Sequence, residues 1–225
     1  MCGRFALAEA RELKQRFHTK NSVPEGVRPN FNAAPTQDLP VIIETDGKPE
    51  IRVMHWGLVP IWAKDKPRFA FSTFNARAAS LTEKPMWKKL FPARRCLVPA
   101  TGFYEWQKRG SEKQPFYIHA GKEPIFAMAG LYDEWIDKET GEVFDSFTII
   151  TTEPNREMKS IHDRMPVILD RDEEAVWLDP KVQDEGELMP LLNPYDSEME
   201  LYEVDRKVGN VRNNSGDLIK PLNSA

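Results

Sequence analysis

The sequence predicts an α+β fold built on a curved or barrel-like, mainly antiparallel sheet with peripheral helices. Short segments of β-branched and aromatic residues recur along the first two thirds of the chain. Turn-forming residues separate several of them, and segments with helical spacing lie near the start and in the last third. The 18 prolines of the 225-residue chain are scattered between these segments. Scattered prolines favour many short elements over a few long ones.

The first expected element is a short helix over Ala8–Phe17. Its apolar residues Ala10, Leu13 and Phe17 recur at helical spacing. We expect this helix to anchor the start of the chain.

The next elements are expected to be strands. The strand-like segments are residues 41–43, 51–56, 96–98, 116–119, 125–135 and 144–151. Lys108–Ser111 and Lys138–Gly141 contain turn formers where a strand must reverse. Because hairpins join antiparallel neighbours, we expect a mainly antiparallel sheet.

The last third returns to helix and then to one more strand. Helices are expected over Asn155–Ile161, Arg171–Leu178 and about Glu185–Leu192, and a strand over Leu201–Val208. A chain of 225 residues with 40% hydrophobic residues can bury a sizeable core without needing two domains. We therefore expect a single domain over residues 1–225.

Several classes of protein are disfavoured by composition. No apolar run reaches the roughly 18 residues of a membrane span, and the start lacks the charged-then-apolar order of a secretory signal, so we expect a cytoplasmic protein without a membrane partner. Two cysteines, Cys2 and Cys96, cannot build a disulfide framework, and no histidine or cysteine pair has metal-ligand spacing. We expect no metal and no cofactor.

The formal net charge of -4 argues against nucleic-acid binding driven by overall basicity. The charges are nevertheless uneven, since residues 173–200 are mostly acidic while many basic residues lie elsewhere. A local basic groove is therefore permitted.

The start of the chain, Met1-Cys2-Gly3-Arg4-Phe5, carries the most chemical information. Methionine aminopeptidases remove an initiator methionine when the next side chain is as small as cysteine, and removal leaves Cys2 with a free amine. An aldehyde that condenses with this amine forms an imine, which the neighbouring thiol closes to a five-membered thiazolidine. By itself, a cysteine after Met1 is as compatible with a small buried residue.

The α-amine suits this reaction better than a lysine does. Its pKa of about 8 leaves it neutral at pH 7 roughly two orders of magnitude more often than a lysine with a pKa of about 10.4. The thiol is already tethered to the imine, so ring closure gains from a high effective concentration.

Six further motifs follow Cys2 in one order along the chain. They are Phe31-Asn32-Ala33-Ala34-Pro35, Trp56-Gly57-Leu58-Val59-Pro60, Asn75-Ala76-Arg77, Gly102-Phe103-Tyr104-Glu105-Trp106, Ile161-His162-Asp163-Arg164-Met165-Pro166 and Val208-Gly209-Asn210-Val211. Together with Met-Cys-Gly-Arg-Phe they resemble the SOS-response-associated peptidase (SRAP) family, the abasic-site processing proteins. The resemblance covers a core of about residues 2–212.

This resemblance implies a covalent DNA partner. The family shields abasic sites in single-stranded DNA through a thiazolidine crosslink between the N-terminal cysteine and the ring-opened deoxyribose. Matched by position, the catalytic residues are Cys2, Asn75, Glu105 and His162. Glu105 would transfer protons, His162 would promote imine chemistry, strand cleavage or crosslink reversal, and Asn75 would hold a sugar hydroxyl or a developing oxygen charge. A cross-strand ion pair, a helix cap and a turn are their respective structural alternatives.

Further residues beside this set are candidates for DNA contact. Arg4, Arg77 and Arg164 adjoin the reactive residues, and Thr151 ends a strand where its hydroxyl could reach a phosphate. Trp62, Met86 and Trp87 flank Asn75 in sequence and would stack on bases beside the lesion or belong to the core. Family members usually carry an acidic residue two positions after the arginine of Asn-x-Arg, whereas this chain has Ala79.

Two other functions remain open from the sequence. The first is a cysteine peptidase or autoprocessing enzyme, with Cys2 as nucleophile, His162 as base and removal of Met1 as its mildest form. The second is a non-catalytic module for single-stranded DNA, which leaves Cys2 unexplained. We favour a monomer that crosslinks abasic sites, with possible lyase-like activity, and that becomes nucleoid-associated when bound to damaged DNA.

Overall fold

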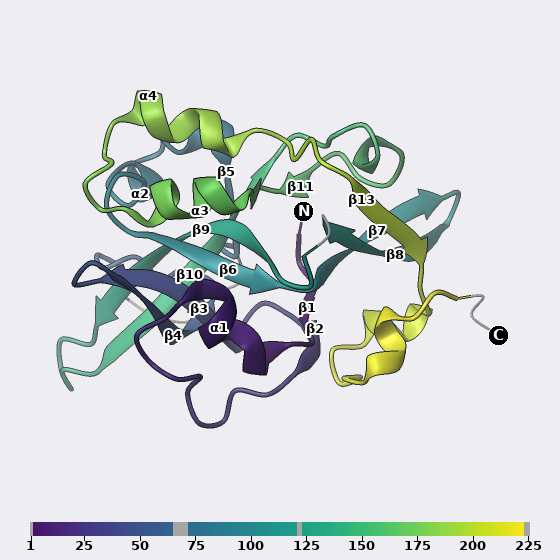
Figure 1. Ribbon diagram of the computed structural model, residues 1–225, viewed down its shortest axis with the longest axis horizontal. Coiled ribbons are helices and arrows are strands. Elements are labelled where there is room, and N and C mark those ends of the chain that lie inside the picture. The colour runs from purple at the N-terminus through teal and green to yellow at the C-terminus, as the bar shows by residue number, and fades with distance from the viewer. Residues whose placement is uncertain (1, 65–71, 121–122, 223–225) are drawn as a thin grey trace.

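Five strands close into a barrel at the centre of the molecule (Figure 1). The computed structural model describes residues 2–64, 72–120 and 123–222. The barrel strands, in spatial order, are β10 (Val143–Thr152), β4 (Lys48–Trp56), β3 (Asp38–Thr45), β6 (Arg95–Ala100) and β9 (Phe126–Ile136). The pairing of β9 with both β6 and β10 completes the ring. The expected barrel-like sheet is confirmed.

Most barrel neighbours are antiparallel, but β10 also has two parallel partners. It pairs with β4, where Ser146 faces His55, and with β5 (Asn75–Arg77), where Ile149 faces Asn75. Two short strands, β11 (Met165–Pro166) and β12 (Ile168–Leu169), pair antiparallel with β10 and β9. As a result, β5 and β11 flank β10 on its two edges at Thr151, although about 90 residues separate them in sequence.

A second sheet of five strands lies beside the barrel (Figure 1). Its order is β13 (Met199–Glu203), β8 (Glu112–Ala120), β7 (Gly102–Arg109), β1 (Phe5–Leu7) and β2 (Asn30–Ala33). The hairpin of β7 and β8 turns at Gly110-Ser111, as expected, and Gly110 has a φ of 61° that suits a tight hairpin turn.

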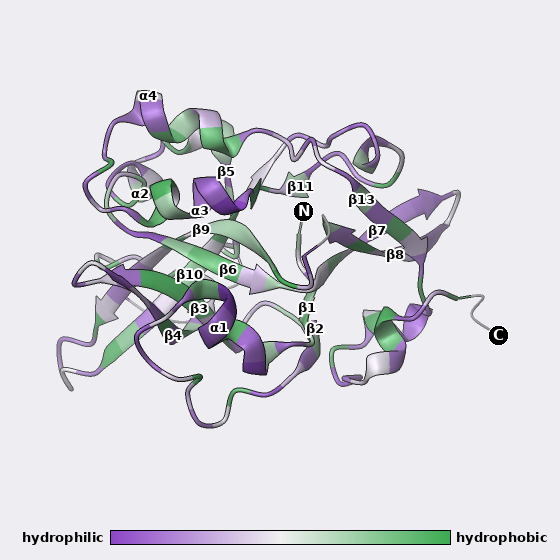
Figure 2. Ribbon diagram, viewed as in Figure 1, coloured by the Kyte–Doolittle hydropathy of each residue, from purple (hydrophilic) through white to green (hydrophobic). Residues whose placement is uncertain are grey.

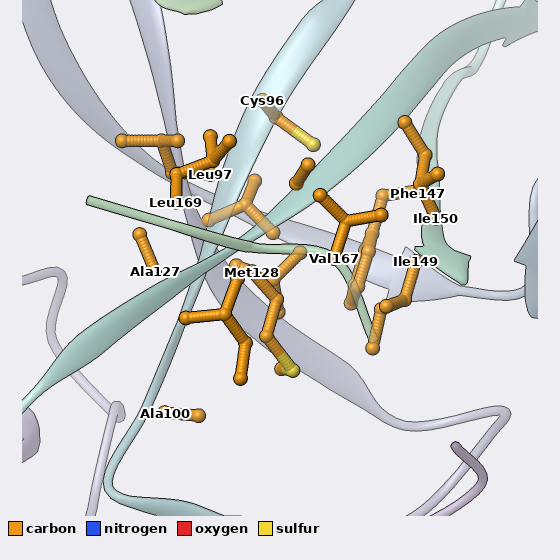
Figure 3. Close-up of a cluster of buried hydrophobic side chains, with 14 of the residues drawn as sticks. Cys96, Leu97, Ala100, Ala127, Met128, Phe147, Ile149, Ile150, Val167 and Leu169 are labelled. Carbon is orange, nitrogen blue, oxygen red and sulfur yellow. The ribbon is translucent and has the colours of Figure 1, made fainter. Parts of the chain in front are cut away.

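The barrel interior is the hydrophobic core. Cys96, Leu97, Met128, Phe147 and Ile149 are buried side chains of three neighbouring strands (Figure 3), and much of the ribbon of these strands is hydrophobic (Figure 2). Gly130 lies where β9 contacts both neighbours; an added Cβ there would lie 2.8 Å from the Cys96 sulfur and 2.9 Å from the Thr148 carbonyl oxygen. A side chain at this position would push the closing strands apart.

Four short helices lie outside the barrel. They are α1 (Leu13–Phe17), α2 (Pro85–Lys88), α3 (Arg171–Leu178) and α4 (Glu185–Leu188). The expected helix over Arg171–Leu178 is confirmed, with a capping box between Asp170 and Glu173. No helix within 2–64, 72–120 and 123–222 is both long and apolar enough to cross a bilayer.

Several expected elements differ in extent or type; the helix expected over Glu185–Leu192, for example, is α4 followed by the 3-10 turn Met189–Leu192. The helix expected over Ala8–Phe17 is one 3-10 turn, Ala10–Glu12, followed by α1, and the one over Asn155–Ile161 is reduced to the 3-10 turn Met158–Ser160. The strand expected over Leu201–Val208 was too long, since β13 ends at Glu203. Asp205 then accepts a hydrogen bond from the Lys207 N–H at 2.8 Å and starts the 3-10 turn Arg206–Gly209.

Candidate active site

The start of the chain runs antiparallel to β7. Phe5 faces Phe103, and the Tyr104 N–H donates to the Arg4 carbonyl oxygen at 2.9 Å. If the same register continues toward the chain start, Gly3 lies next to Glu105 and Cys2 next to Trp106. The strand pairing therefore carries the chain start to one end of the second sheet, next to the barrel.

Cys2 is fixed in this position by Asn75. The Asn75 side-chain Nδ2 donates to the Cys2 carbonyl oxygen at 2.8 Å, and the parallel pairing of β5 with β10 sets the height of Asn75. The Asn75 Oδ1 is buried and accepts no hydrogen bond from the described residues. The Cys2 side chain is wholly buried, and burial, followed by the nearby Glu105 carboxylate, raises the pKa of its thiol to about 12. The thiol is therefore neutral at physiological pH.

Glu105 is the most perturbed acid of this region. Its side chain comes from β7 and is only 3% exposed. Burial raises the pKa of the Glu105 carboxyl to about 7. Near neutral pH the carboxyl thus exists in both protonation states, as a group that must both give and take protons requires.

His162 approaches Glu105 from the segment before β11. Its Nε2 lies 3.8 Å from the Glu105 Oε2, which is too long for a direct hydrogen bond but within the range of contacts that tighten when substrate binds. Its Nδ1 lies 2.9 Å from Asp163 Oδ1 and 3.1 Å from the Arg164 backbone nitrogen, which donates to it. Burial lowers the pKa of His162, so its neutral form prevails at pH 7.

A cavity of about 620 Å³ opens beside these two residues. It is lined by Glu105, Trp106, Lys108, Lys113, Ile161, His162, Asp163 and Gly209. A cavity of this volume accommodates a nucleotide-sized group.

Arg77, Arg164 and Thr151 lie together where β5 and β11 pair with the end of β10. Arg77 and Thr151 are partners in the pairing of β5 with β10, and Thr151 also faces Pro166 of β11. Arg77 is exposed, and its guanidinium has no hydrogen bond or ion pair among the described residues. The pKa of Arg164 is lowered first by burial of Arg164 and then by the positive charge of Arg77. Two cations this close favour an anionic ligand between them.

Thr151 has a different role from the one expected. Its side chain is fully buried, its hydroxyl donates to the Ala76 carbonyl oxygen at 3.3 Å, and it accepts from the Arg164 Nη2 at 2.6 Å. Because its hydroxyl is already used twice, Thr151 orients Arg164 and does not face a phosphate itself.

Arg4 likewise points into the protein. Its Nη1 donates to Asn32 Oδ1 at 2.8 Å and to the Val208 carbonyl oxygen at 2.7 Å, and its guanidinium lies 5.9 Å from the centre of the Trp106 ring. Its Nε is buried and has no hydrogen-bond partner among the described residues. In this structure Arg4 ties the chain start to the C-terminal segment.

The three candidate stacking residues separate. Trp62 is 60% exposed and remains accessible to a base, whereas Met86 is half-buried against the core. Trp87 is only 5% exposed and packs in the core, which is the structural alternative that the sequence left open for it. The amphipathic turn of α2 buries Trp87 and leaves its neighbours Lys88 and Lys89 in solvent.

The sequence did not single out Asn32 as a site residue. Its Nδ2 donates to the carbonyl oxygens of Val208, Asn210 and Asn213 at 2.8–3.2 Å while its Oδ1 accepts from Arg4. Asn32 and Val208 belong to two of the quoted motifs, which was the available signal for a joint role.

Comparison with known proteins agrees with the geometry. The family model for SOS response associated peptidase (SRAP) matches residues 1–211. The chain belongs to the SRAP family. It is 42% identical to the Bacillus subtilis abasic site processing protein YoqW over 98% of this chain and 99% of that protein. The Xenopus tropicalis abasic site processing protein HMCES is 36% identical over 87% of this chain and 67% of its own length.

A solved structure shares the fold. A crystal structure of a Bacteroides thetaiotaomicron protein superposes with a TM-score of 0.90 at 32% identity, covering 98% of this chain and 99% of that one. In this SRAP chain, Cys2 and Asn75 are joined by a hydrogen bond, and Glu105 and His162 lie 3.8 Å apart. Motif residues from four separate segments thus meet in one place.

Burial of Glu105 predicts a pH-dependent gain in stability for Glu105→Gln. The carboxyl ionises near its usual value of 4.5 in the unfolded chain but near 7 in the folded one. Stability of the unmodified chain therefore falls as pH rises from 4.5 to 7, and the neutral amide avoids this loss. Above pH 7, E105Q should unfold with a free energy larger by about 3 kcal/mol.

Urea unfolding at pH 4.5 and pH 8 measures this effect. The exposed Glu139→Gln provides the control and should show no such difference. A stability gain for E105Q that is the same at both pH values would contradict a buried carboxyl with a raised pKa.

Proposed function

We propose that this protein captures abasic sites in single-stranded DNA by a thiazolidine crosslink from Cys2. The observation that carries the proposal is the placement of Cys2: its carbonyl is held by Asn75, and its thiol lies close enough to Glu105 for that carboxylate to raise the thiol pKa. The relatives named abasic site processing proteins support the choice of lesion.

The reaction divides between the amine and the thiol of Cys2. After removal of Met1, the neutral amine attacks the C1′ aldehyde of the ring-opened deoxyribose and forms a carbinolamine, which loses water to give an imine. The thiol sulfur then bonds to the imine carbon, and its proton passes to the nitrogen. Since the thiol pKa is about 12, deprotonation must accompany the attack and needs an adjacent base.

Glu105 supplies both proton transfers in this scheme. As a carboxylic acid it protonates the leaving hydroxyl of the carbinolamine, and the resulting carboxylate accepts the thiol proton during ring closure. Its pKa near 7 makes both forms available. Asn75 Oδ1, buried without a donor, accepts a hydrogen bond from the sugar hydroxyl.

His162 and the arginines complete the site. Neutral His162 exchanges protons with Glu105 across the 3.8 Å separation and supports imine formation or reversal. Arg77 and Arg164 bind the phosphate beside the lesion, and the exposed Trp62 stacks on a neighbouring base. We propose a monomer without cofactor for this reaction.

A cysteine peptidase fits the same geometry less well. A peptidase needs a thiolate paired with a base such as histidine, whereas the Cys2 thiol is buried next to a carboxylate that opposes its ionisation. An aminothiol that captures an aldehyde begins with the amine and tolerates a neutral thiol.

Substitution of Cys2 distinguishes the bond that the amine nitrogen forms from the bond that the thiol sulfur forms. Cys2→Ala and Cys2→Ser both keep a small second residue, so Met1 removal and the free amine are retained while the thiol is lost. With a single strand containing one abasic site, the unmodified chain should give a heat-stable adduct on a denaturing gel. Both variants should give an adduct only after borohydride reduction traps the imine. A heat-stable adduct of C2A without reduction would remove the thiol from the mechanism.

Loss of the Glu105 carboxyl should slow chemistry without weakening binding. E105Q should form the heat-stable adduct about 100-fold more slowly, the lower end of the contribution of a general acid and base. Binding to a strand with a tetrahydrofuran analogue, which has no aldehyde, should stay within about twofold of the unmodified chain, as for E139Q. Equal losses in rate and in affinity would contradict proton transfer by Glu105.

A further inference from the structure

The far end of the β7–β8 hairpin carries a pair of lysines that the proposed chemistry leaves unused. Lys108 on β7 and Lys113 on β8 face one another directly in the antiparallel register. Both are exposed, and both line the 620 Å³ cavity that Glu105 and His162 also line. The strongly hydrophilic end of this hairpin is visible in Figure 2.

The lysine pair differs from the charged residues next to it, because those residues form ion pairs. Arg109 binds Glu203 at 2.6 Å and Arg206 binds Glu112 at 2.5 Å, so the residue pairs that flank the lysines hold their own counter-charges. Neither Lys108 nor Lys113 has an ion pair in the part of the chain that the structure describes. Like charges directly opposite on a sheet destabilise each other, and an anion between them relieves this repulsion.

The lysine pair and the arginine pair lie on different sides of the reactive residues. Arg77 and Arg164 belong to β5 and the segment before β11, on the barrel side, whereas the β7–β8 hairpin points away from the barrel (Figure 1). The segment that leads into β1 and carries Cys2 runs between them. In a chain of net charge -4, two separate cationic pairs about one site indicate a polyanion that passes through it.

We propose that Lys108 and Lys113 bind a second backbone phosphate of the lesion strand, on the side of the abasic nucleotide opposite to Arg77 and Arg164. This proposal rests on the proposed function, and it adds that the protein binds the DNA strand on both sides of the lesion. The lysines contribute affinity and the register of the strand, while Cys2 and Glu105 carry the chemistry.

Neutralising both lysines tests the proposal independently of the crosslink. Affinity is measured with single strands that carry the tetrahydrofuran analogue, so no covalent bond forms. The matched control is Lys48→Gln with Lys138→Gln, one exposed lysine at the start of β4 and one in the turn between β9 and β10, which change the net charge by the same amount. K108Q/K113Q should bind about tenfold more weakly than K48Q/K138Q near 0.1 M salt. Its plot of log affinity against log salt should be shallower by about 1.4, the value for two lost single-strand phosphate contacts.

Truncation of the DNA strand shows on which side of the lesion the lysines bind. Strands cut to one nucleotide on the 5′ side or on the 3′ side of the analogue should differ: one truncation should abolish the difference between K108Q/K113Q and K48Q/K138Q, and the other should preserve it. Equal affinities and salt slopes for the two double variants on the full strand would overturn the lysine site. A difference that survives both truncations would overturn its placement on one side of the lesion. Heat-stable adduct formation at saturating strand reports separately on the proposed function, and its failure would leave the binding result readable.

Discussion

The antiparallel pairing of the chain start with β7 is the constraint on which the site depends. It places the Cys2 segment alongside Glu105, and the Asn75 hydrogen bond to the Cys2 carbonyl then fixes its position against the barrel. A free chain end would normally move, and ordering its residues costs conformational entropy. The buried contacts of Phe5, Leu7 and Arg4 offset that cost before substrate arrives. The proposed nucleophile, Cys2, is therefore held in place by strand pairing before any substrate binds.

Burial then gives each reactive group its chemical character. Removal from water keeps the Cys2 thiol neutral, brings the Glu105 pKa to about 7 and favours neutral His162. A site made of neutral or half-ionised groups suits condensation, in which protons move at every step and no permanent charge forms on the protein. The cost is a destabilising buried carboxyl, which is the common compromise between stability and activity at such sites. The cations that we propose to bind the DNA strand, Arg77, Arg164, Lys108 and Lys113, lie at the periphery of the site.

Local sequence patterns predicted individual strands and helices, but not the pairings between residues that are far apart in the chain. β-Branched and aromatic segments with turn residues between them gave the strands of the barrel and the β7–β8 hairpin, and helical patterning gave α3 with its observed bounds. The parallel pairing of β10 with β4 and β5 joins residues more than 70 positions apart, and no local signal encodes it. The same limit explains Arg4 and Thr151, whose partners Val208, Ala76 and Arg164 come from other elements, and Trp87, whose short helix does not reveal which side is buried. The motifs named Cys2, Asn75, Glu105 and His162 only through the family resemblance; spacing alone could not bring them together.

Intact mass spectrometry of the purified adduct tests the central claim most directly. Condensation followed by ring closure releases one water, so the adduct should weigh as much as the chain without Met1 plus the intact abasic strand, less one water. Proteolysis should then locate the DNA on the peptide that begins at Cys2. An adduct that retains Met1, or DNA attached to a lysine side chain, would contradict capture by the aminothiol of Cys2.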